Sequence, residues 1–247
     1  MEIVVTSTSC QDDLALAPHL SVILSQCVEC VGVGLVPTER ALPLLPAPFR
    51  LPDDSQPVTP LVVLAQHCAG IAVDGQAPQG GILVEVGLLV VPPDGSGDVN
   101  AFTLWSFTTD AELASSLQRL GLDAQHIPAI SFEVSSDGTS ATNSISVPYP
   151  GHPSLMMHGT VTPADMSNMP GAPGPFVANW WGKVDSGLLK LETHVPEWSP
   201  SPAQLTVTTS NDSPLGQLIG GISMGFPVLQ NGNVFAYAAT EVRVIPM

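Results

Sequence analysis

The sequence predicts a mainly β fold: a closed or cone-like antiparallel barrel that carries two or three short helices. Three observations favour it. The 247 residues include 25 prolines and 22 glycines. The apolar runs are short, and turn-forming sequences such as Asp94–Gly97 and Asp137-Gly138 separate them. Many short strands joined by turns are typical of barrels and sandwiches. We expect one domain that spans residues 1–247.

Ten segments are predicted strands, because each is a short apolar or alternating run between turn residues. They are Ser21–Leu35, Leu61–Cys68, Ile82–Val91, Ala101–Thr108, Ala129–Val134, Ser144–Val147, Ser154–Thr162, Gly187–Val195, Gln204–Thr209 and Asn233–Pro246. No internal repeat of about 20–50 residues relates these segments, so the pattern does not indicate a solenoid.

Two helices are predicted from the residues at their ends. Asp110 is a suitable N-cap for a helix that ends just before Gly121. Pro214 is well placed at the first position of a second helix, which ends at Gly220. The long loop over residues 163–175 has no periodicity, and we interpret it as a candidate lid.

The acidic balance of the chain limits its partners. Twenty-two acidic residues outnumber six basic ones, which gives a net charge of −16, and the arginines are scattered. Binding to nucleic acid or to an anionic membrane needs clustered lysine and arginine, so we exclude both classes. No apolar run of about 18 residues is present, and the first residues do not form a secretory signal. We therefore expect a cytoplasmic protein.

Cys27 and Cys30 have the Cys-x-x-Cys spacing of zinc and redox sites. They lie in a strand-like run, where residues three apart point to opposite faces of a sheet. Only His67 and Cys68 could complete a zinc site. We therefore interpret these residues as ordinary core cysteines and expect no metal site.

Several segments resemble, in order, the acetoacetate decarboxylase-like superfamily. They are Thr38–Leu42, Leu45–Phe49, Pro60–Leu64, Leu83–Gly87, Val90–Pro92, the helix Asp110–Leu120, Pro175–Trp181 and Ser213–Gly221. Together these segments extend over most of the chain, and their order carries the resemblance. It implies the barrel of that superfamily, a small-molecule carbonyl substrate, no cofactor, and assembly into a homo-oligomer whose size the sequence does not fix.

The lysine on which the best-known chemistry of the superfamily depends is missing. In the family, a Gly-x-Pro step leads to a lysine that forms a Schiff base. Here the step reads Gly121–Gln125, and Ala124 stands where that lysine would be. The two lysines of the chain, Lys183 and Lys190, lie far downstream. Alanine and glutamine cannot form the iminium that takes up electrons during decarboxylation, so the sequence argues against a Schiff-base mechanism.

Glu85 is the first candidate catalytic residue. It lies in the apolar run Ile82–Val91, and the resemblance places an active-site acid there. Burial raises the pKa of a carboxyl group, which suits a general acid or base; the alternative is a structural acid paired with an arginine. His158, in the run Leu155–Thr160, is the second candidate, as a proton carrier inside a barrel. Its alternative is a core or surface histidine.

Three further polar residues are candidates for binding the substrate. Alternation in the strand Leu61–Cys68 allows only one of Gln66 and His67 to point inward, and we choose Gln66 because the resemblance implies a pocket position near it. Gln125 and His126 lie on the turn that would have carried the lysine. They could hydrogen-bond a substrate carbonyl, and the alternative is that they face solvent.

Asn179, Trp180 and Trp181 complete the candidate binding residues. In a strand, the two adjacent tryptophans point to opposite sides, so one could line the pocket while the other covers the exterior. Asn179 could anchor an oxygen of the substrate. The polar face that begins at Lys190 in the strand Gly187–Val195 is interpreted as the wet face of a sheet.

These residues together predict a lysine-independent enzyme that acts on a β-keto or polyketide-like small molecule by enolisation. Aldol, Michael, dehydration and cyclisation steps of secondary metabolism all fit that chemistry. Such an enzyme would be of lyase or cyclase type and would need no cofactor. Two alternatives stay open: a non-catalytic barrel that binds apolar small molecules, and a decarboxylase that works without an imine.

Overall fold

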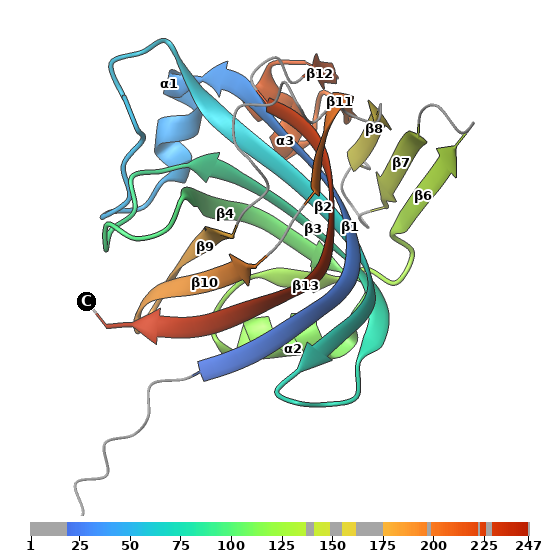
Figure 1. Ribbon diagram of the computed structural model, residues 1–247. Helices are drawn as coiled ribbons and strands as arrows, with labels where there is room; N and C mark the ends of the chain where they lie inside the picture. The colour runs from blue at the N-terminus through green and yellow to red at the C-terminus, as the bar shows by residue number, and fades with distance from the viewer. Residues whose placement is uncertain are drawn as a thin grey trace, which may run out of the picture.

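The structure is a computed structural model, and it describes residues 19–136, 141–148, 155–161, 175–196, 199–221, 223–225 and 229–246. The predicted lid over residues 163–175 lies outside this part of the chain, apart from its last residue. The described residues form long curved strands that wrap around one interior, with three short α-helices at the ends of the strands (Figure 1). The predicted mainly β class is therefore confirmed.

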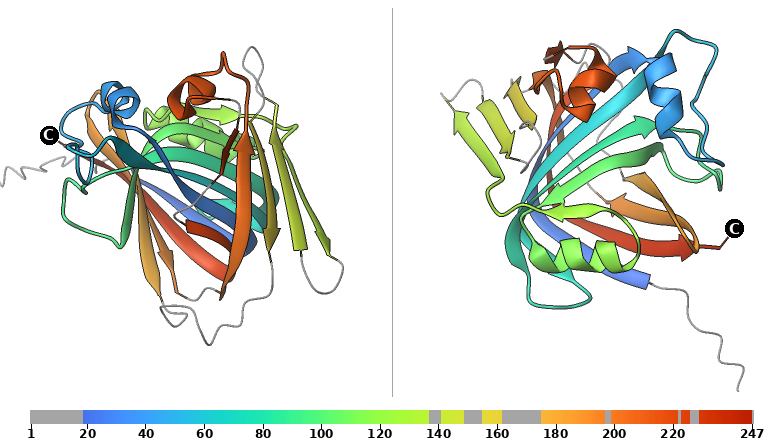
Figure 2. Two further views of the ribbon diagram at one scale, coloured as in Figure 1. Left: turned by 90° about the horizontal axis from the view of Figure 1, so that it is seen from above. Right: turned by 180° about the vertical axis from the view of Figure 1, so that it is seen from behind.

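Seven of the described strands close into a barrel (Figures 1 and 2). In spatial order they are β1 (His19–Pro37), β2 (Val58–Val73), β3 (Gln79–Leu89), β4 (Val99–Thr108), β9 (Phe176–Val184), β10 (Gly187–Val195) and β13 (Leu229–Ile245). Pairing between β1 and β13 closes the ring. One pairing in the ring, β4 with β9, is parallel, whereas the sequence had suggested only antiparallel neighbours.

A second group of strands extends from one side of the barrel. It contains β6 (Ser131–Ser136), β7 (Ala141–Val147), β8 (Leu155–Val161), β11 (Ser199–Thr208) and β12 (Ser223–Gly225). Residues 199–202 of β11 pair with β13, which joins this group to the barrel. Its apolar side chains pack on the outer face of β1–β4; Ile145, Met157 and Leu205 belong to the same buried cluster as Val63 and Val86.

Both predicted helices are confirmed, and their caps explain their limits. The Asp110 side chain accepts a 2.8 Å hydrogen bond from the Leu113 amide at the start of α2 (Ala111–Arg119). At the start of α3 (Pro214–Ile219), Ser213 Oγ accepts a 2.8 Å hydrogen bond from the Gly216 amide. Two further turns of helix, α1 (Thr38–Ala41) and a 3-10 turn (Leu42–Leu44), follow β1. None of the helices in the described residues is long and apolar enough to cross a membrane.

The strands that were not predicted are β9, β12 and the short β5 (Ala124–His126). β5 pairs in parallel with residues 106–108 of β4, and β9 pairs in parallel with residues 99–102 of β4. Neither pairing is a hairpin, so no local turn signal marks it. Strand β11 also begins earlier than predicted. Its first residues pair with β13, and their prolines, Pro200 and Pro202, had hidden this part of the strand in the sequence.

The cysteines differ from the prediction. Cys27 on β1 and Cys68 on β2 are direct cross-strand partners and form a disulfide, with 4.0 Å between their Cα atoms. They are therefore not two ordinary core thiols. Cys30 points to the other face of β1, where its sulfur accepts a 2.8 Å hydrogen bond from the Asn143 side chain. Burial, the largest cause, raises the pKa of the Cys30 thiol to about 11.

Candidate active site

The barrel encloses a cavity of about 260 Å³. Its walls are mainly valine, leucine and alanine side chains of β1, β2, β3, β9 and β10, with Phe176 and Trp180 as the aromatic members. The exposed residues Asp98 and Val99 are among those that line it, so the cavity reaches the surface near the start of β4. A small apolar chamber with a few polar groups is the usual form of a small-molecule site.

Glu85 is the polar centre of this cavity. Its side chain lines the cavity from β3 and is only 3% exposed. Its Oε1 atom is buried and has no hydrogen-bond partner in the described part of the chain. Burial, and secondly the negative charge of Glu29, raise the pKa of Glu85 from 4.5 to about 8. The group is therefore mainly a neutral acid at pH 7, and it can donate a hydrogen bond.

A second acid, Glu29 on β1, lies close to Glu85. Glu29 is 5% exposed and lines the same cavity. Gln66 on β2 donates a 2.6 Å hydrogen bond from Nε2 to Glu29 Oε2. Gln66 pairs laterally with Leu83 on β3, two residues before Glu85, so the amide lies diagonally beside that carboxyl group. Two carboxyl groups and one amide thus gather on adjacent strands.

One row across the barrel wall connects Glu85 to Ala124, the position at which the resemblance had predicted the family lysine. Glu85 pairs with Ser106 on β4, and Ser106 pairs with Ala124 on β5. Directly paired residues share a face of the sheet, so all three side chains point to the same side. Ser106 is 1% exposed, and its hydroxyl has no hydrogen-bond partner among the described residues. Ala124 packs against Leu117 of α2 in the interior cluster.

Trp180 and Gly87 shape the cavity beside Glu85. Trp180 lines the cavity from β9. Gly87 lies two residues beyond Glu85 on the same face of β3. A Cβ atom on Gly87 would lie 2.7 Å from the Trp180 ring and 2.6 Å from the Phe102 carbonyl oxygen. Only glycine therefore allows the indole to lie against this part of the wall.

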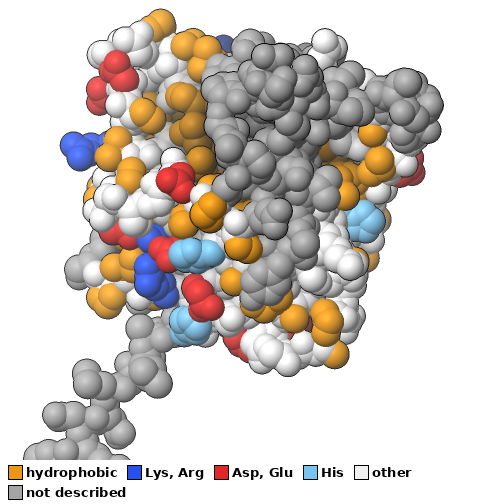
Figure 3. All heavy atoms as spheres, in the orientation of Figure 1, with side chains coloured by type: hydrophobic (Ala, Val, Ile, Leu, Met, Phe, Trp, Pro, Cys, Tyr) orange, Lys and Arg blue, Asp and Glu red, His pale blue; other side chains and the backbone are white. Residues whose placement is uncertain are grey.

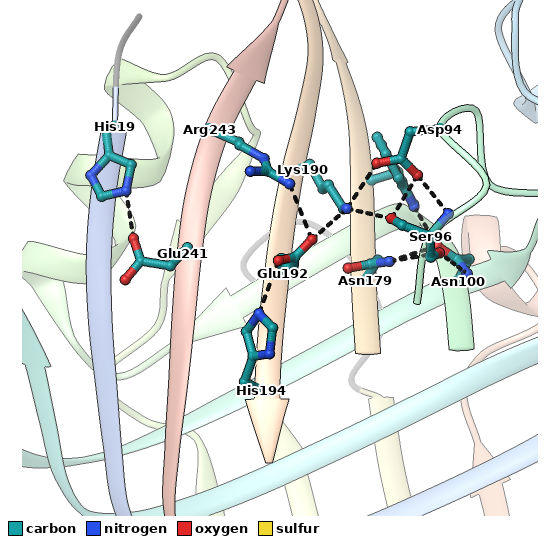
Figure 4. Close-up of polar contacts among 11 residues, drawn as sticks. His19, Asp94, Ser96, Asn100, Asn179, Lys190, Glu192, His194, Glu241 and Arg243 are labelled. Atoms are coloured by element: carbon teal, nitrogen blue, oxygen red, sulfur yellow. Dashed lines mark hydrogen bonds and ion pairs between the residues drawn. The ribbon is translucent and has the colours of Figure 1, made fainter. Parts of the chain in front are cut away.

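Both lysines lie on the outside of the barrel. Lys183 is exposed on β9. Lys190 is 0% exposed, yet it points outward from β10, because its neighbours Leu189 and Leu191 belong to the interior cluster. Its ammonium group donates to Asp94 at 2.8 Å and to Glu192 at 2.5 Å (Figure 4). The predicted wet face of this strand is thus partly buried, because the turn that contains Asp94 covers it.

The outer network around Lys190 extends along β10 and β13. Glu192 also receives a 3.1 Å hydrogen bond from Arg243 and lies 2.9 Å from His194 Nε2 (Figure 4). Hydrogen bonding from Lys190 is the largest cause that lowers the pKa of Glu192. In this region of the surface, acidic, basic and histidine side chains lie together (Figure 3). No lysine ammonium therefore reaches the cavity.

Asn179 and Trp181 have their polar atoms in this outer layer. Asn179 is among the residues that line the cavity, but its amide donates to Asn100 Oδ1 at 2.9 Å and to the Ser96 carbonyl (Figure 4). Trp181 is fully buried on the outer face, and its indole N–H donates to the same Asn100 oxygen at 2.9 Å. Lys190 Nζ lies 5.3 Å from the centre of its ring. Trp180 is therefore the tryptophan on the cavity side.

Three other predicted residues lie apart from the cavity. His158 is on β8 in the second group of strands, and its side chain is exposed. It had been predicted to lie inside a barrel, but the strand that carries it is not a barrel strand. Gln125 is half-buried, donates to Asp123, and precedes the exposed His126. Neither residue is among those that line the cavity.

The sequence analysis did not suggest Glu29, which lines the cavity, or Ser106, which shares the inner face of the sheet with Glu85. Glu29 carries the same signal as Glu85, a single acid in an apolar strand, but it lies within the Cys27–Cys30 run, which was interpreted only for its cysteines. Within the described residues, no group of three or more histidine, cysteine and acidic side chains is arranged to hold a metal ion.

Comparison with solved structures identifies the fold. An acetoacetate decarboxylase structure has a TM-score of 0.58 at 11% identity and covers 91% of this chain and 89% of its own. The enduracididine biosynthesis enzyme MppR, complexed with the condensation product of pyruvate and imidazole 4-carboxaldehyde, has a TM-score of 0.56 at 13% identity and coverages of 93% and 90%. An acetoacetate decarboxylase-like enzyme from Sphingomonas wittichii RW1 has a TM-score of 0.52 at 10% identity and coverages of 92% and 94%.

Sequence comparisons give no further relatives: no protein-family model matches the chain, and no curated protein sequence matches it. Identities of 10–13% over nine-tenths of the chain indicate a shared architecture with almost completely different side chains. The resemblance predicted from the sequence is thus confirmed at the level of the fold, and the chemistry must be argued from the cavity itself.

Proposed function

We propose that this protein, which has the acetoacetate decarboxylase-like fold, is an enzyme that enolises a small carbonyl compound without forming an imine. The observation that carries the proposal is Glu85, a buried carboxyl group with a pKa of about 8 that lines an apolar cavity beside a second acid, Glu29. Perturbed acids in enclosed apolar sites are the usual means of proton transfer near neutral pH.

The two acids take different roles in this proposal. Glu85, protonated at pH 7, donates a hydrogen bond to the substrate carbonyl oxygen. Glu29, held by Gln66, removes a proton from the carbon next to that carbonyl. The electrons of the broken C–H bond form the new C=C bond, the carbonyl π electrons move to oxygen, and oxygen receives the Glu85 proton. The product is a neutral enol, and one proton has moved from Glu85 to Glu29 overall.

The surroundings favour this transfer. The cavity walls are mainly apolar, so the hydrogen bond from Glu85 forms in a region of low dielectric constant, where it is stronger than in water. The Ser106 hydroxyl, which points to the same side and lacks a partner in the described part of the chain, supplies a second donor for developing negative charge on oxygen. A positioned acid or base contributes about 10²-fold or more to such a rate.

The enol is the point from which several reactions diverge. Addition to a second carbonyl, addition to an unsaturated ketone, loss of water and ring closure all begin from it. We place the protein among the lyase- or cyclase-type biosynthetic enzymes of secondary metabolism that act on β-keto or polyketide-like compounds. Support comes from the structural similarity to MppR, which carries a condensation product of pyruvate and an aldehyde.

Proton exchange tests this proposal directly. We expect the protein to accelerate the exchange of α-protons for deuterium in uncharged ketones and 3-keto amides, as followed by NMR in D₂O. Glu85→Gln and Glu29→Gln should each reduce the acceleration by about 100-fold or more. Glu39→Gln, the same change on exposed helix α1, should leave it unchanged. If all three variants exchange at the rate of the unaltered protein, the enolisation mechanism is wrong.

A non-catalytic carrier is the second candidate, and the predominantly apolar lining of the cavity favours it. A carrier would bind the same compounds and return them with their α-protons unexchanged. A decarboxylase that works without an imine would instead release carbon dioxide from a β-keto acid. The exchange experiment, together with carbon dioxide detection on a β-keto acid as a separate substrate, therefore separates the three activities.

A further inference from the structure

Among the described residues, acidic side chains line the cavity, and no lysine, arginine or histidine does. All six lysines and arginines of the chain lie in the described residues. Five are exposed at the surface, namely Arg40, Arg50, Arg119, Lys183 and Arg243, and Lys190 is buried in the outer network. None of the six lines the cavity, and no histidine in the described part of the chain does so. The segments that are not described contain no lysine or arginine that could reach in.

The acidic residues that line the cavity in the described part of the chain are Glu29 and Glu85 in its wall and Asp98 at its rim, and Glu85 is mainly protonated at pH 7. A substrate carboxylate would therefore lose its hydration in an apolar chamber, meet the charge of Glu29, and find no cation. A buried charge without a partner costs several kcal/mol in proteins, and a like charge adds to that cost. The net charge of −16 further lowers the local concentration of anions around the protein.

We propose that the cavity binds an uncharged 1,3-dicarbonyl compound, such as a 3-keto amide, ketone or ester, and rejects the corresponding β-keto carboxylate. This inference rests on the proposed function, which gives the class of carbonyl chemistry. It adds the requirement that the substrate carries no charge. It removes β-keto acids from the substrates considered above, and with them decarboxylation as the main reaction.

Two buried oxygen atoms without a hydrogen-bond partner, on the inner face of the sheet, match such a ligand. Glu85 and Ser106 are lateral partners on β3 and β4, both deeply buried, and Glu85 Oε1 and Ser106 Oγ have no partner among the described residues. Cβ atoms of directly paired residues are about 5 Å apart. Two donors at this separation suit the two oxygens of a 1,3-dicarbonyl compound, and Trp180 offers its ring to the apolar end of the molecule.

The sharpest test uses two probes of nearly equal shape, acetoacetamide and acetoacetate, which differ at pH 7 by one negative charge. Titration calorimetry on the full chain should give a dissociation constant for acetoacetamide at least about tenfold below that for acetoacetate. Equal or tighter binding of acetoacetate overturns the proposal, and so does a failure of acetoacetamide to bind.

Two variants identify the source of the selectivity. Glu29→Gln removes the charge that the anion would meet, so the preference for the amide should shrink severalfold. Glu39→Gln, on the exposed surface of α1, should keep the full preference. A preference that is the same in both variants would show that Glu29 does not set it. Circular dichroism on each variant checks that the barrel has folded.

The outcomes separate this inference from the proposed function. Selective binding of acetoacetamide without deuterium exchange would contradict enolisation and keep the charge assignment. Deuterium exchange that is faster with acetoacetate than with acetoacetamide would keep enolisation and contradict the charge assignment.

Discussion

Ala124 on β5 and Glu85 on β3 lie in one row of the barrel wall, with Ser106 of β4 between them. The resemblance places a Schiff-base lysine at Ala124, so an ammonium group at that position would lie near the Glu85 carboxyl. A neighbouring cation lowers the pKa of an acid, whereas burial without one raises it. With alanine at this position, none of the six lysines and arginines lies beside Glu85, and its pKa stays raised.

The first prediction concerns covalent capture. Because neither lysine faces the cavity, borohydride reduction in the presence of a ketone should give no adduct beyond the slow labelling of exposed amines such as Lys183. The variant Ala124→Lys places an amine in the row of Glu85, and we expect it to gain a reducible adduct at that residue. Mass spectrometry with peptide mapping reads both results. A reduced adduct on Lys190 of the unaltered protein would contradict its burial in the outer network.

The pH dependence of deuterium exchange is the second prediction. Glu85 acts as an acid in the proposed mechanism, and its pKa of about 8 is the pH at which half of it has lost the proton. The catalysed rate should therefore fall as the pH rises through about 8, by tenfold for each further pH unit. Rates measured between pH 6 and 10, after subtraction of exchange without protein, test this. A rate that stays level up to pH 10 would remove Glu85 as the acid.

Stability should depend on pH through the same group. The folded state raises the pKa of Glu85 from 4.5 to about 8, so it binds this proton more tightly than the unfolded chain does. The contribution to the free energy of unfolding is complete below pH 4.5 and is lost as the pH rises to about 8, at about 1.4 kcal/mol per unit of pKa shift.

Glu85→Gln removes this titration. Urea unfolding at pH 6 and pH 9 should show that the unaltered protein loses several kcal/mol more than the variant between the two conditions. The exposed acid variant Glu39→Gln is the control, and it should follow the unaltered protein. Parallel losses in the unaltered protein and Glu85→Gln would show that the Glu85 pKa is ordinary.

The two lysines offer a matched pair for the outer network. Lys190→Met leaves Asp94 and Glu192 without their shared cation, and we expect a loss of about 2–3 kcal/mol in the free energy of unfolding. This loss of stability is smaller than the loss expected for a fully buried ion pair, because both carboxyl groups are partly exposed to solvent. Lys183→Met, on the exposed surface of β9, should cost less than about 1 kcal/mol, because an exposed lysine gains little from an ion pair. Equal effects of the two changes would contradict the network.

The disulfide between Cys27 and Cys68 is the last prediction. It closes a loop with a sequence separation of 41 residues. A loop of this length corresponds to about 4 kcal/mol in the chain-entropy description, so Cys27→Ala should lower the free energy of unfolding by up to that amount. Non-reducing peptide mapping should recover the two cysteines in one linked species. Cys30→Ala is the control variant, since Cys30 has a free thiol.

Local signals predicted local features well. The N-caps Asp110 and Ser213 fixed the starts of two helices, because a cap acts on the three or four residues that follow it. Glu85 was predicted to line a lumen from its apolar strand, the resemblance favoured Gln66 over His67, and both Glu85 and Gln66 line the cavity. Alternation placed Trp180 and Trp181 on opposite sides of the strand, although it could not say which of the two lies inside.

Features that depend on distant pairing could not be read in the same way. His158 has the pattern of a barrel strand, but β8 pairs with β7 and β11 outside the barrel, and no local signal records that choice. Asn179 shares a strand with the inner Trp180, but its amide is taken by Asn100 and Ser96 from a segment about 80 residues earlier. The cross-strand disulfide likewise needed the register of β1 and β2.

Gln26 has a backbone φ of 50° in the middle of β1. Leu24 before it and Cys27 after it both belong to the interior cluster, so the alternation of the strand reverses at this point. Glu29 lies inside only because of that reversal; regular alternation from Leu24 would turn it outward. A homologue could therefore keep a glutamate at this position and still lack the second acid, if its backbone stayed extended three residues earlier. To judge whether a homologue has kept the activity, one would then have to compare the backbone torsion angle at this position as well as the acidic residue itself.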